Sequence, residues 1–285
     1  MEEVLLKAEG LRYSYGQEKE ALKGIDLTVK KGEKIVVLGS NGAGKSTLFL
    51  TLNGVLTPDS GRIIYREKEI GKKDMNELRR NVGIVFQDAD NQIIASTVFS
   101  EVSFGPMNLR LPKEEVVKRV NSSLASMNLT EMKDRPPHYL SGGEKKRVSI
   151  ADIIAMEPEV ILFDEPTASL DPVNVKMLKE VLDEMTHLGK TLLISTHDVD
   201  FAFQWAERAL VFSGGNMIAD GPVREVFDSP DVLEEANLRK PVIMEVFESL
   251  VRHGALQKEA VCPKDAGELD GMLQADTCRW KEIDR

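Results

Sequence analysis

One nine-residue stretch, Gly39-Ser-Asn-Gly-Ala-Gly-Lys-Ser-Thr47, constrains the fold of this chain more than any other. It fits the pattern G-x-x-x-x-G-K-[ST], which is typical of a phosphate-binding loop. The apolar run at residues 34–38 before it predicts a buried parallel strand, and residues 47–56 after it predict a helix. This strand–loop–helix order favours phosphate binding over the alternative, a glycine turn that binds nothing.

The chemistry of this loop predicts a nucleoside triphosphate ligand. Its glycines let the backbone turn tightly and bring N–H groups close to phosphate oxygens. The N-terminus of the following helix adds unpaired donors and a partial positive charge. We expect Lys45 to contact the β- and γ-phosphates and the Ser46 hydroxyl to contact Mg²⁺. The residues expected to bind the nucleotide here are Gly39, Ser40, Asn41, Gly42, Ala43, Gly44, Lys45, Ser46 and Thr47.

Composition narrows the classes of function. With 285 residues, 42% of them apolar, the chain can bury the core of one or two domains. Its net charge of −10 argues against a general nucleic-acid surface. The two cysteines, Cys262 and Cys278, form no metal-binding or disulfide pattern, which favours a reducing cytoplasm. The N-terminus lacks the layout of a signal peptide, and no apolar run approaches the roughly 18 residues of a membrane span.

Strands that alternate with helices along most of the chain predict an α/β fold with a mainly parallel core sheet. Residues 4–29 predict an additional antiparallel β subdomain, and residues 88–145 predict an inserted helical subdomain. We expect one main domain at 4–243, followed by a C-terminal helical extension and tail at 244–285. Residues 254–285 could be a regulatory tail or a frayed end, and we favour the frayed end.

Polar residues follow three of the predicted buried strands. Strand 34–38 leads into the loop, strand 160–163 ends in Asp164-Glu165, and strand 191–195 is followed by Thr196-His197-Asp198. In open parallel sheets, ligands bind at the carboxyl ends of the strands. We therefore expect the loop, the acidic pair and His197 to share one edge of the sheet, which favours a functional over a structural histidine.

The adjacent carboxylates of Asp164 and Glu165 are costly after a buried strand unless a cation compensates them. Mg²⁺ with a triphosphate would do so. Asp164 would then hold the metal, and Glu165 would orient and polarise an attacking water. The alternative, a helix N-cap before Pro166, accounts for one carboxylate and not for both.

Two further segments predict helix starts whose roles stay open at this stage. Ser141-Gly-Gly-Glu144 is a capping box that opens a helix over 144–156. It could act only as a cap, or its two glycines could leave a bare helix end for a second phosphate contact. Asp171-Pro172 likewise could be only the N-cap of a helix over 173–188. Gln87, at the end of a strand, is uninformative by composition alone.

Taken in order, these motifs resemble the nucleotide-binding subunits of ATP-binding-cassette (ABC) transporters over roughly residues 4–222. The matching positions are Tyr15, the loop at 39–47, Gln87, Leu140–Glu144, Ile161–Glu165, Ser169–Asp171 and His197. The segment Leu140–Glu144 resembles the signature that separates this family from other P-loop proteins. It carries Glu144 where many family members have glutamine.

The resemblance implies that two copies stack head to tail, with ATP between the loop of one copy and Ser141, Gly142 and Gly143 of the other. It implies adenine stacking on Tyr15 and coupling of the two sites through Asp171. It also implies Mg²⁺ contacts from Ser46, Gln87 and Asp164. The expected catalytic residues are Glu165, His197, which would contact the γ-phosphate, and Gln87, which would touch the metal or the attacking water.

A narrower likeness connects residues 90–94, 104–109 and 236–241 to the ATPase subunits of energy-coupling-factor (ECF) importers, notably the cobalt type. It implies a second ATPase subunit, identical or paralogous, and membrane scaffold and substrate-binding proteins. Dimer contacts are expected at 223–252. The chain would be peripheral at the cytoplasmic face of the cell membrane. The cargo stays open between cobalt, nickel, biotin and other vitamins.

Two other functions remain possible at this stage. One is a soluble ABC ATPase that acts on nucleic acid or ribosomes, although a single loop and the span from Lys45 to Asp164 leave no room for the second cassette or long insertion usual there. The other is a non-enzymatic regulatory subunit, against which the intact Glu165 and His197 argue.

Overall fold

The computed structural model describes residues 3–283 except 17–18, 90–91, 169 and 258. Ser169 of the motif at 169–171, and the first two residues of the motif at 90–94, therefore lie outside the described residues. No helix in the described part of the chain is long and apolar enough to cross a bilayer.

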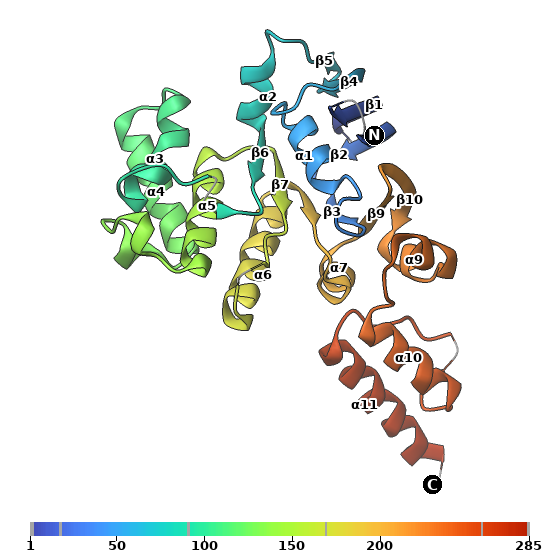
Figure 1. Ribbon diagram of the computed structural model, residues 1–285. Coiled ribbons are helices and arrows are strands. Elements are labelled where there is room, and N and C mark those ends of the chain that lie inside the picture. The colour runs from blue at the N-terminus through green and yellow to red at the C-terminus, as the bar shows by residue number, and fades with distance from the viewer. Residues whose placement is uncertain (1–2, 17–18, 90–91, 169, 258, 284–285) are drawn as a thin grey trace.

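The centre of the molecule is a six-stranded sheet in the order β10-β9-β3-β8-β7-β6 (Figure 1). Its strands are β3 (Lys34–Leu38), β6 (Val82–Val85), β7 (Val160–Asp164), β8 (Thr191–Ser195), β9 (Arg208–Ser213) and β10 (Asn216–Pro222). All neighbours pair in parallel except β9 and β10, which form the antiparallel hairpin at one edge. The prediction of a mainly parallel core sheet is confirmed.

Both faces of this sheet are covered, and this explains why its strands are continuous apolar runs. In β3, Val36 and Leu38 face one core cluster, and Ile35 and Val37 face the other. The first cluster includes residues of α5 (Gly142–Met156), α6 (Pro172–His187) and α7 (Val199–Trp205). The second is closed by α1 (Lys45–Leu52) and by a second sheet.

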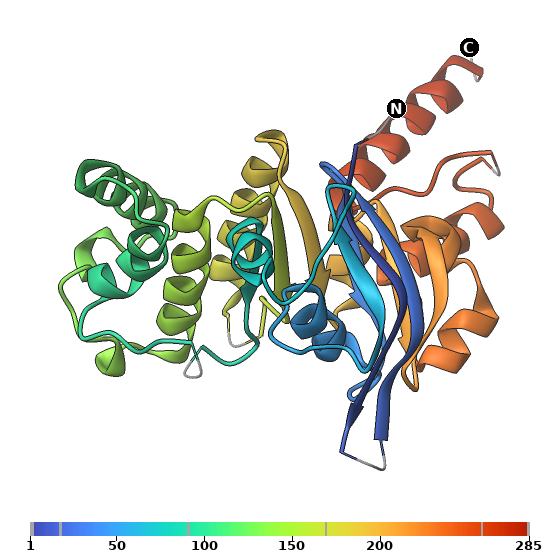
Figure 2. The same cartoon turned by 90° about the horizontal axis from the view of Figure 1, so that it is seen from above.

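This second sheet is the antiparallel N-terminal subdomain that the sequence predicts. Its order is β2-β1-β4-β5, with β1 (Val4–Tyr15), β2 (Lys19–Lys30), β4 (Ser60–Tyr65) and β5 (Lys68–Glu69). The short helix α2 (Met75–Asn81) follows it. Figure 2 shows β1 and β2 as a long curved ribbon beside the central sheet. The β1 strand ends at Tyr15, whose hydroxyl lies within hydrogen-bonding distance of Thr47 in the first turn of α1.

The helical subdomain lies on the opposite side of the central sheet from the β9–β10 hairpin (Figure 1). It contains α3 (Val98–Asn108), α4 (Lys113–Ser126), the short turns η2 (Thr130–Met132) and η3 (Pro137–Tyr139), and α5. Helix α5 begins at Gly142, slightly before the predicted start at Glu144, because Ser141 is its N-cap.

The C-terminal region contains α8 (Val223–Phe227), α9 (Pro230–Ala236), α10 (Val242–Arg252) and α11 (Ala266–Ile283). The sequence predicts a C-terminal helical extension and tail here, and the choice between a regulatory tail and a frayed end for residues 254–285 stays open. Residues 266–283 form α11, which extends away from the central sheet in Figure 1. Leu256 and Leu269 are buried, and Cys262 packs against the main core cluster. These apolar contacts hold the segment against the rest of the chain.

Candidate active site

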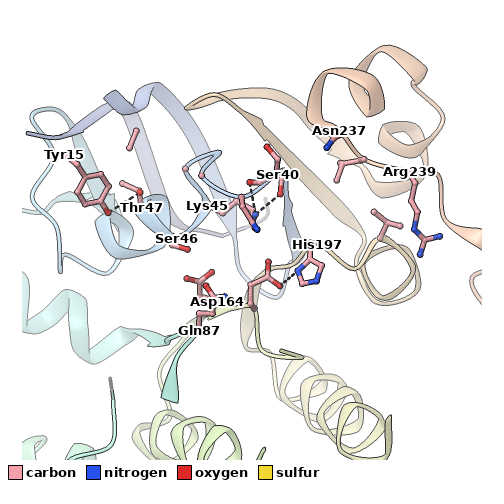
Figure 3. A pocket seen from close by; sticks show the side chains of 18 residues that line it. Tyr15, Ser40, Lys45, Ser46, Thr47, Gln87, Asp164, His197, Asn237 and Arg239 are labelled. Carbon is pink, nitrogen blue, oxygen red and sulfur yellow. Dashed lines mark hydrogen bonds and ion pairs between the residues drawn. The ribbon is translucent and has the colours of Figure 1, made fainter. Parts of the chain in front are cut away.

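The carboxyl ends of β3, β7 and β8 open into a cavity of about 840 Å³ (Figure 3). The sheet argument predicts this meeting of strand ends, and the structure brings the loop, the acidic pair and His197 together there. The predicted site residues that line the cavity are Tyr15, Gly39, Ser40, Asn41, Gly42, Gly44, Lys45, Ser46, Thr47, Gln87, Asp164, Glu165 and His197. Ala43 belongs to the same loop but is buried beneath it.

The conformation of the loop requires glycine at two positions. Gly39 has φ 141° and Gly44 has φ 113°, both outside the range that side chains favour. A Cβ atom at Gly39 would lie 2.3 Å from the carbonyl oxygen of Phe212, and one at Gly44 would lie 2.6 Å from that of Ala21. Backbone packing therefore fixes the loop over the start of α1. Since Gly44 is the N-cap residue of α1, no cap side chain stands in front of the helix N-terminus.

The Lys45 ammonium is already inside this loop. Its Nζ donates to the carbonyl oxygens of Gly39 at 2.7 Å and Ser40 at 3.3 Å. Burial lowers the pKa of Lys45, and the carboxylates of Glu165 and Asp164 partly oppose that effect. The cation is thus held between the backbone and the acidic pair, where phosphate oxygens would be equivalent acceptors.

The acidic pair is buried and oriented by Ser195, a residue that the sequence does not single out. The Ser195 hydroxyl donates to Asp164 Oδ1. The backbone N–H of Glu165 lies 3.1 Å from both the carbonyl and the hydroxyl oxygen of Ser195. The end of β8 therefore fixes both the carboxylate of Asp164 and the backbone of Glu165.

Glu165 has a strained backbone, with φ 46° in the left-handed region that is uncommon for residues other than glycine. Its Oε2 lies 2.9 Å from Nδ1 of His197, and this contact is drawn in Figure 3. Glu165 is buried, whereas 73% of the His197 side chain is exposed. The pair therefore reaches from the end of β7 to the open side of the cavity.

Three oxygen-bearing side chains lie where a magnesium ion is expected. A second cavity of about 530 Å³ adjoins the first, and Ser46, Gln87 and Asp164 line both. A hydroxyl, an amide carbonyl and a carboxylate are ligands that suit Mg²⁺, which commonly takes one or two carboxylates together with substrate phosphates and water. The residues present therefore fit the ion.

Tyr15 stands at the opposite end of the cavity from His197 in Figure 3. Its ring is half exposed and packs edge-on against Tyr13, with ring centroids 5.0 Å apart. The Tyr15 hydroxyl lies 3.3 Å from Oγ1 of Thr47. One ring face thus remains available for stacking by a planar ligand beside the loop.

The four remaining predicted residues are not part of the main cavity. Ser141 forms the capping box of α5: its N–H donates to Glu144 Oε2 at 2.7 Å, and its Oγ accepts from Glu144 N at 3.3 Å. The hydrogen bond from the Ser141 N–H to this carboxylate is the main cause that lowers the pKa of Glu144. Gly142 lines the adjoining cavity, but Ser141, Gly143 and Asp171 line neither.

Asp171 is the N-cap of α6, where its Oδ1 accepts from Asn174 N at 2.9 Å. The capping interpretation is therefore realised for both Ser141 and Asp171. It leaves their second predicted role, toward another copy of the chain, as a prediction.

Besides Ser195, the structure adds two groups of residues that local sequence reasoning misses. Asn237, Leu238 and Arg239 line the main cavity, because Asn237 ends α9 in a left-handed conformation and turns the chain back toward it. Their segment is noted in the sequence only as part of a likeness at 236–241. The other is Lys146, a buried lysine on α5 that contacts the backbone at Gln87.

Comparison with known proteins agrees with this geometry. Residues 22–168 match the family model described as "ABC transporter". A curated relative from Methanocaldococcus jannaschii, the energy-coupling factor transporter ATP-binding protein EcfA, is 46% identical over 86% of this chain and 89% of its own length. The protein EcfA2 of Methanospirillum hungatei is 44% identical over 88% of this chain.

Some relatives are longer than this chain. It spans 64% of the Methanospirillum hungatei protein and 62% of a Methanosarcina mazei relative that is 42% identical to it over 98% of this chain.

Solved structures give the same result. CbiO1 of Clostridium perfringens, described as part of the ABC transporter complex CbiONQ, is 44% identical and superposes with a TM-score of 0.72 over 87% of this chain and all of that one. An ATP-binding cassette described as a dimer in a post-hydrolysis state, bound to ADP and Pi, is 28% identical with a TM-score of 0.71. It covers 77% of this chain and 99% of its own.

Proposed function

Because this chain belongs to the ABC transporter family, we propose that it is the ATP-binding and ATP-hydrolysing subunit of a membrane importer of the ECF type. The observation that carries the proposal is the cavity at the strand ends. It combines a lysine-bearing phosphate loop, a magnesium-type donor set and the paired side chains of Glu165 and His197. The EcfA and CbiO1 names of its relatives support an importer, and the cobalt type is the narrower form of the proposal.

Each part of the cavity has a task in hydrolysis. Lys45 and the N-terminus of α1 stabilise negative charge on the phosphates, and Tyr15 stacks on the adenine. When bound by Ser46, Gln87 and Asp164, Mg²⁺ supplies further positive charge at the β- and γ-phosphates. Glu165 accepts a hydrogen bond from the attacking water and orients it, and His197 contacts the γ-phosphate from the exposed side.

A second copy, or a paralogous subunit, completes the site. The tip of α5 at Ser141 and Gly142 is exposed, and Gly142 offers no side chain over the helix N-terminus. Such a helix end attracts anions. In a head-to-tail pair, Ser141, Gly142 and Gly143 of one copy close over the loop of the other, and Asp171 couples the two sites. The region 223–252 supplies further contacts between subunits.

Membrane partners hold the chain at the cytoplasmic face of the membrane. A groove of about 1110 Å³ lies beside α3 and α5, and Phe86, Gln92 and Phe104 line it. Phe104 in the groove and Met107, elsewhere on α3, are more than half exposed, and such exposure of large apolar side chains marks an interaction surface. We propose that the scaffold protein binds in this groove, which Phe86, the residue before Gln87, also lines.

Extraction of the full chain from membranes in detergent, followed by purification and an ATPase assay, tests the proposal. We expect membrane proteins to co-purify and ATP to be hydrolysed. A Lys45→Ala variant should keep the membrane partners but lose activity, since its cation at the phosphates is gone. ATPase activity without membrane partners would instead favour a soluble ABC ATPase, and absence of activity in the assembled complex would favour a regulatory subunit.

A further inference from the structure

A lysine lies fully buried on α5, one turn after the exposed helix tip. Lys146 is 2% exposed, although lysine is among the residues least often buried. Its three N–H donors all point at backbone carbonyl oxygens: those of Phe86 at 2.7 Å, Gln87 at 2.9 Å and Asp164 at 3.4 Å. No part of the mechanism described above uses this side chain.

These three carbonyls belong to the two segments that carry the magnesium-type donors. Phe86 and Gln87 directly follow β6, and Asp164 is the last residue of β7. Lys146 also lines the adjoining cavity with Ser46, Gln87 and Asp164. The Lys146 side chain therefore connects α5 with the backbone of Gln87 and Asp164, two of the three residues expected to bind Mg²⁺.

A buried ammonium is costly, and the surroundings show what compensates it. Burial lowers the pKa of Lys146 to about 8, while the carboxylates of Asp164, Glu165 and Asp88 favour its charged form. A methionine of similar length would fill the same space without this cost. The fully used donor set indicates that the lysine serves to hold backbone, not to fill a core.

We propose that Lys146 is a positioning residue for ATP hydrolysis: it fixes the backbone of Gln87 and Asp164 relative to α5, so that closure of the α5 tip on a nucleotide and alignment of the metal-side donors occur together. This inference rests on the ATPase proposed above. It assigns Lys146 an effect on turnover through Gln87 and Asp164, without contact to the nucleotide.

Kinetics of Lys146→Met in the assembled complex test the proposal, with Lys118→Met, an exposed lysine on α4, as the matched control. We expect kcat to fall by roughly 10²-fold, as for a misplacement of about 1 Å, with little change in KM for ATP. Lys146→Arg should recover part of the loss, because it keeps the charge and the donors. A lysine that only fills the core predicts instead that the methionine variant keeps its kcat and is equally or more stable.

A double-mutant cycle separates positioning from a general structural defect. Because Lys146 acts partly through Gln87 and partly through Asp164, the loss of kcat in the double variant Lys146→Met/Gln87→Ala should be smaller than the product of the two single losses. Losses that multiply would overturn the proposal.

Hydrogen exchange of the nucleotide-free chain gives a readout that does not need hydrolysis. The amides at residues 87–89 and 165 should exchange faster in Lys146→Met than in Lys118→Met. The comparison is made under conditions in which both variants are equally stable. Unchanged exchange at these amides would overturn the link even if kcat falls. Should the wild-type complex hydrolyse no ATP, the proposed function fails, while the exchange result still decides whether Lys146 holds this backbone.

Discussion

At the scale of single residues, the arrangement of Glu165 separates binding from turnover. Its carboxylate lies against His197 and is not among the donors of the loop, so it can be neutralised without removing a phosphate contact. We expect Glu165→Gln to bind ATP as the wild type does, to hydrolyse it roughly 10²- to 10⁴-fold more slowly, and to accumulate as a closed dimer.

Single-turnover hydrolysis and size-exclusion chromatography with ATP measure these effects. Glu180→Gln, which changes an exposed carboxylate on α6, is the control. Unchanged turnover in the Glu165 variant would remove this residue from its proposed role.

A second residue-scale prediction concerns Asp152, on α5 beside the groove. Burial raises its pKa to about 7, and Glu101 adds to this, while a hydrogen bond from Gln92 opposes it. Its Oδ1 is buried and has no hydrogen-bond partner among the described residues. Between about pH 4 and pH 7 the folded chain keeps a proton that the unfolded chain loses, so the free energy of unfolding falls as pH rises.

Asp152→Asn should therefore remove this part of the pH dependence and stabilise the chain at pH 8 by roughly 1 to 3 kcal/mol. Denaturant unfolding of both proteins at pH 5 and pH 8 measures it. Parallel pH profiles for the two proteins would contradict the raised pKa.

The residues that sequence reasoning finds and those it misses differ in the range of their contacts. The loop, Asp164, Glu165 and His197 follow apolar strands directly, so their position at the sheet edge can be predicted from local pattern. Ser195 contacts Asp164, which lies 31 residues earlier in the sequence, and Lys146 contacts Phe86, which lies 60 residues earlier. Within its own helix Lys146 is an ordinary helix former, and nothing local predicts its burial.

At the scale of elements, α10 depends on a carboxylate from another helix. Asp200 on α7 accepts from Val242 N at 2.7 Å and from the guanidinium of Arg239. Pro241, the N-cap residue of α10, has no side-chain group that caps the helix. Asp200 thus supplies the cap from outside, three residues after His197, and so ties the C-terminal helices to the cavity edge.

We expect Asp200→Ala to weaken the start of α10 by about 1 kcal/mol, seen as roughly fivefold faster hydrogen exchange of its first-turn amides. Asp200→Asn keeps an acceptor for Val242 N and should recover most of this protection, while Arg239→Ala isolates the ion pair. Equal exchange in the alanine variant and the wild type would show that α10 is capped by other means.

The elements themselves could be predicted where apolar periodicity is strong. The core strands and α6 lie within a few residues of their predicted bounds, because their buried positions repeat regularly. The sequence predicts a helical extension at 244–285 but not the bounds of α11, since Gly267 and Gly271 lie in the first two turns of that helix. Leu269 of this helix is buried, and such burial can be seen only in the folded chain.

At the scale of the whole molecule, the proposed function makes one copy of the chain carry two halves of different sites. The loop lies in the main cavity, and Ser141 and Gly143 lie outside it. No sequence pattern distinguishes a capping box that only caps from one that also binds phosphate on another subunit. The proposed head-to-tail arrangement would resolve this ambiguity, because it would give the exposed α5 tip a ligand that its own chain does not bring to it.

Subunit complementation tests that arrangement directly. Lys45→Ala inactivates the loop, and Ser141→Arg blocks the helix tip, so each variant alone should be inactive. When the two variants are mixed in equal amounts, half of the dimers contain one chain of each kind. Each mixed dimer has one intact site, which combines the loop of the Ser141→Arg chain with the helix tip of the Lys45→Ala chain. If the sites act independently, ATPase activity should therefore recover to about a quarter of the wild-type value. The control is a double variant that carries both changes, mixed with an equal amount of wild type. Its mixed dimers have no intact composite site, so activity should fall to the quarter that the wild-type dimers supply, whereas sites formed within one chain would keep half. Activity that stays absent in the complementing mixture, although native mass spectrometry shows mixed dimers, would mean that the tip does not act on the partner's nucleotide.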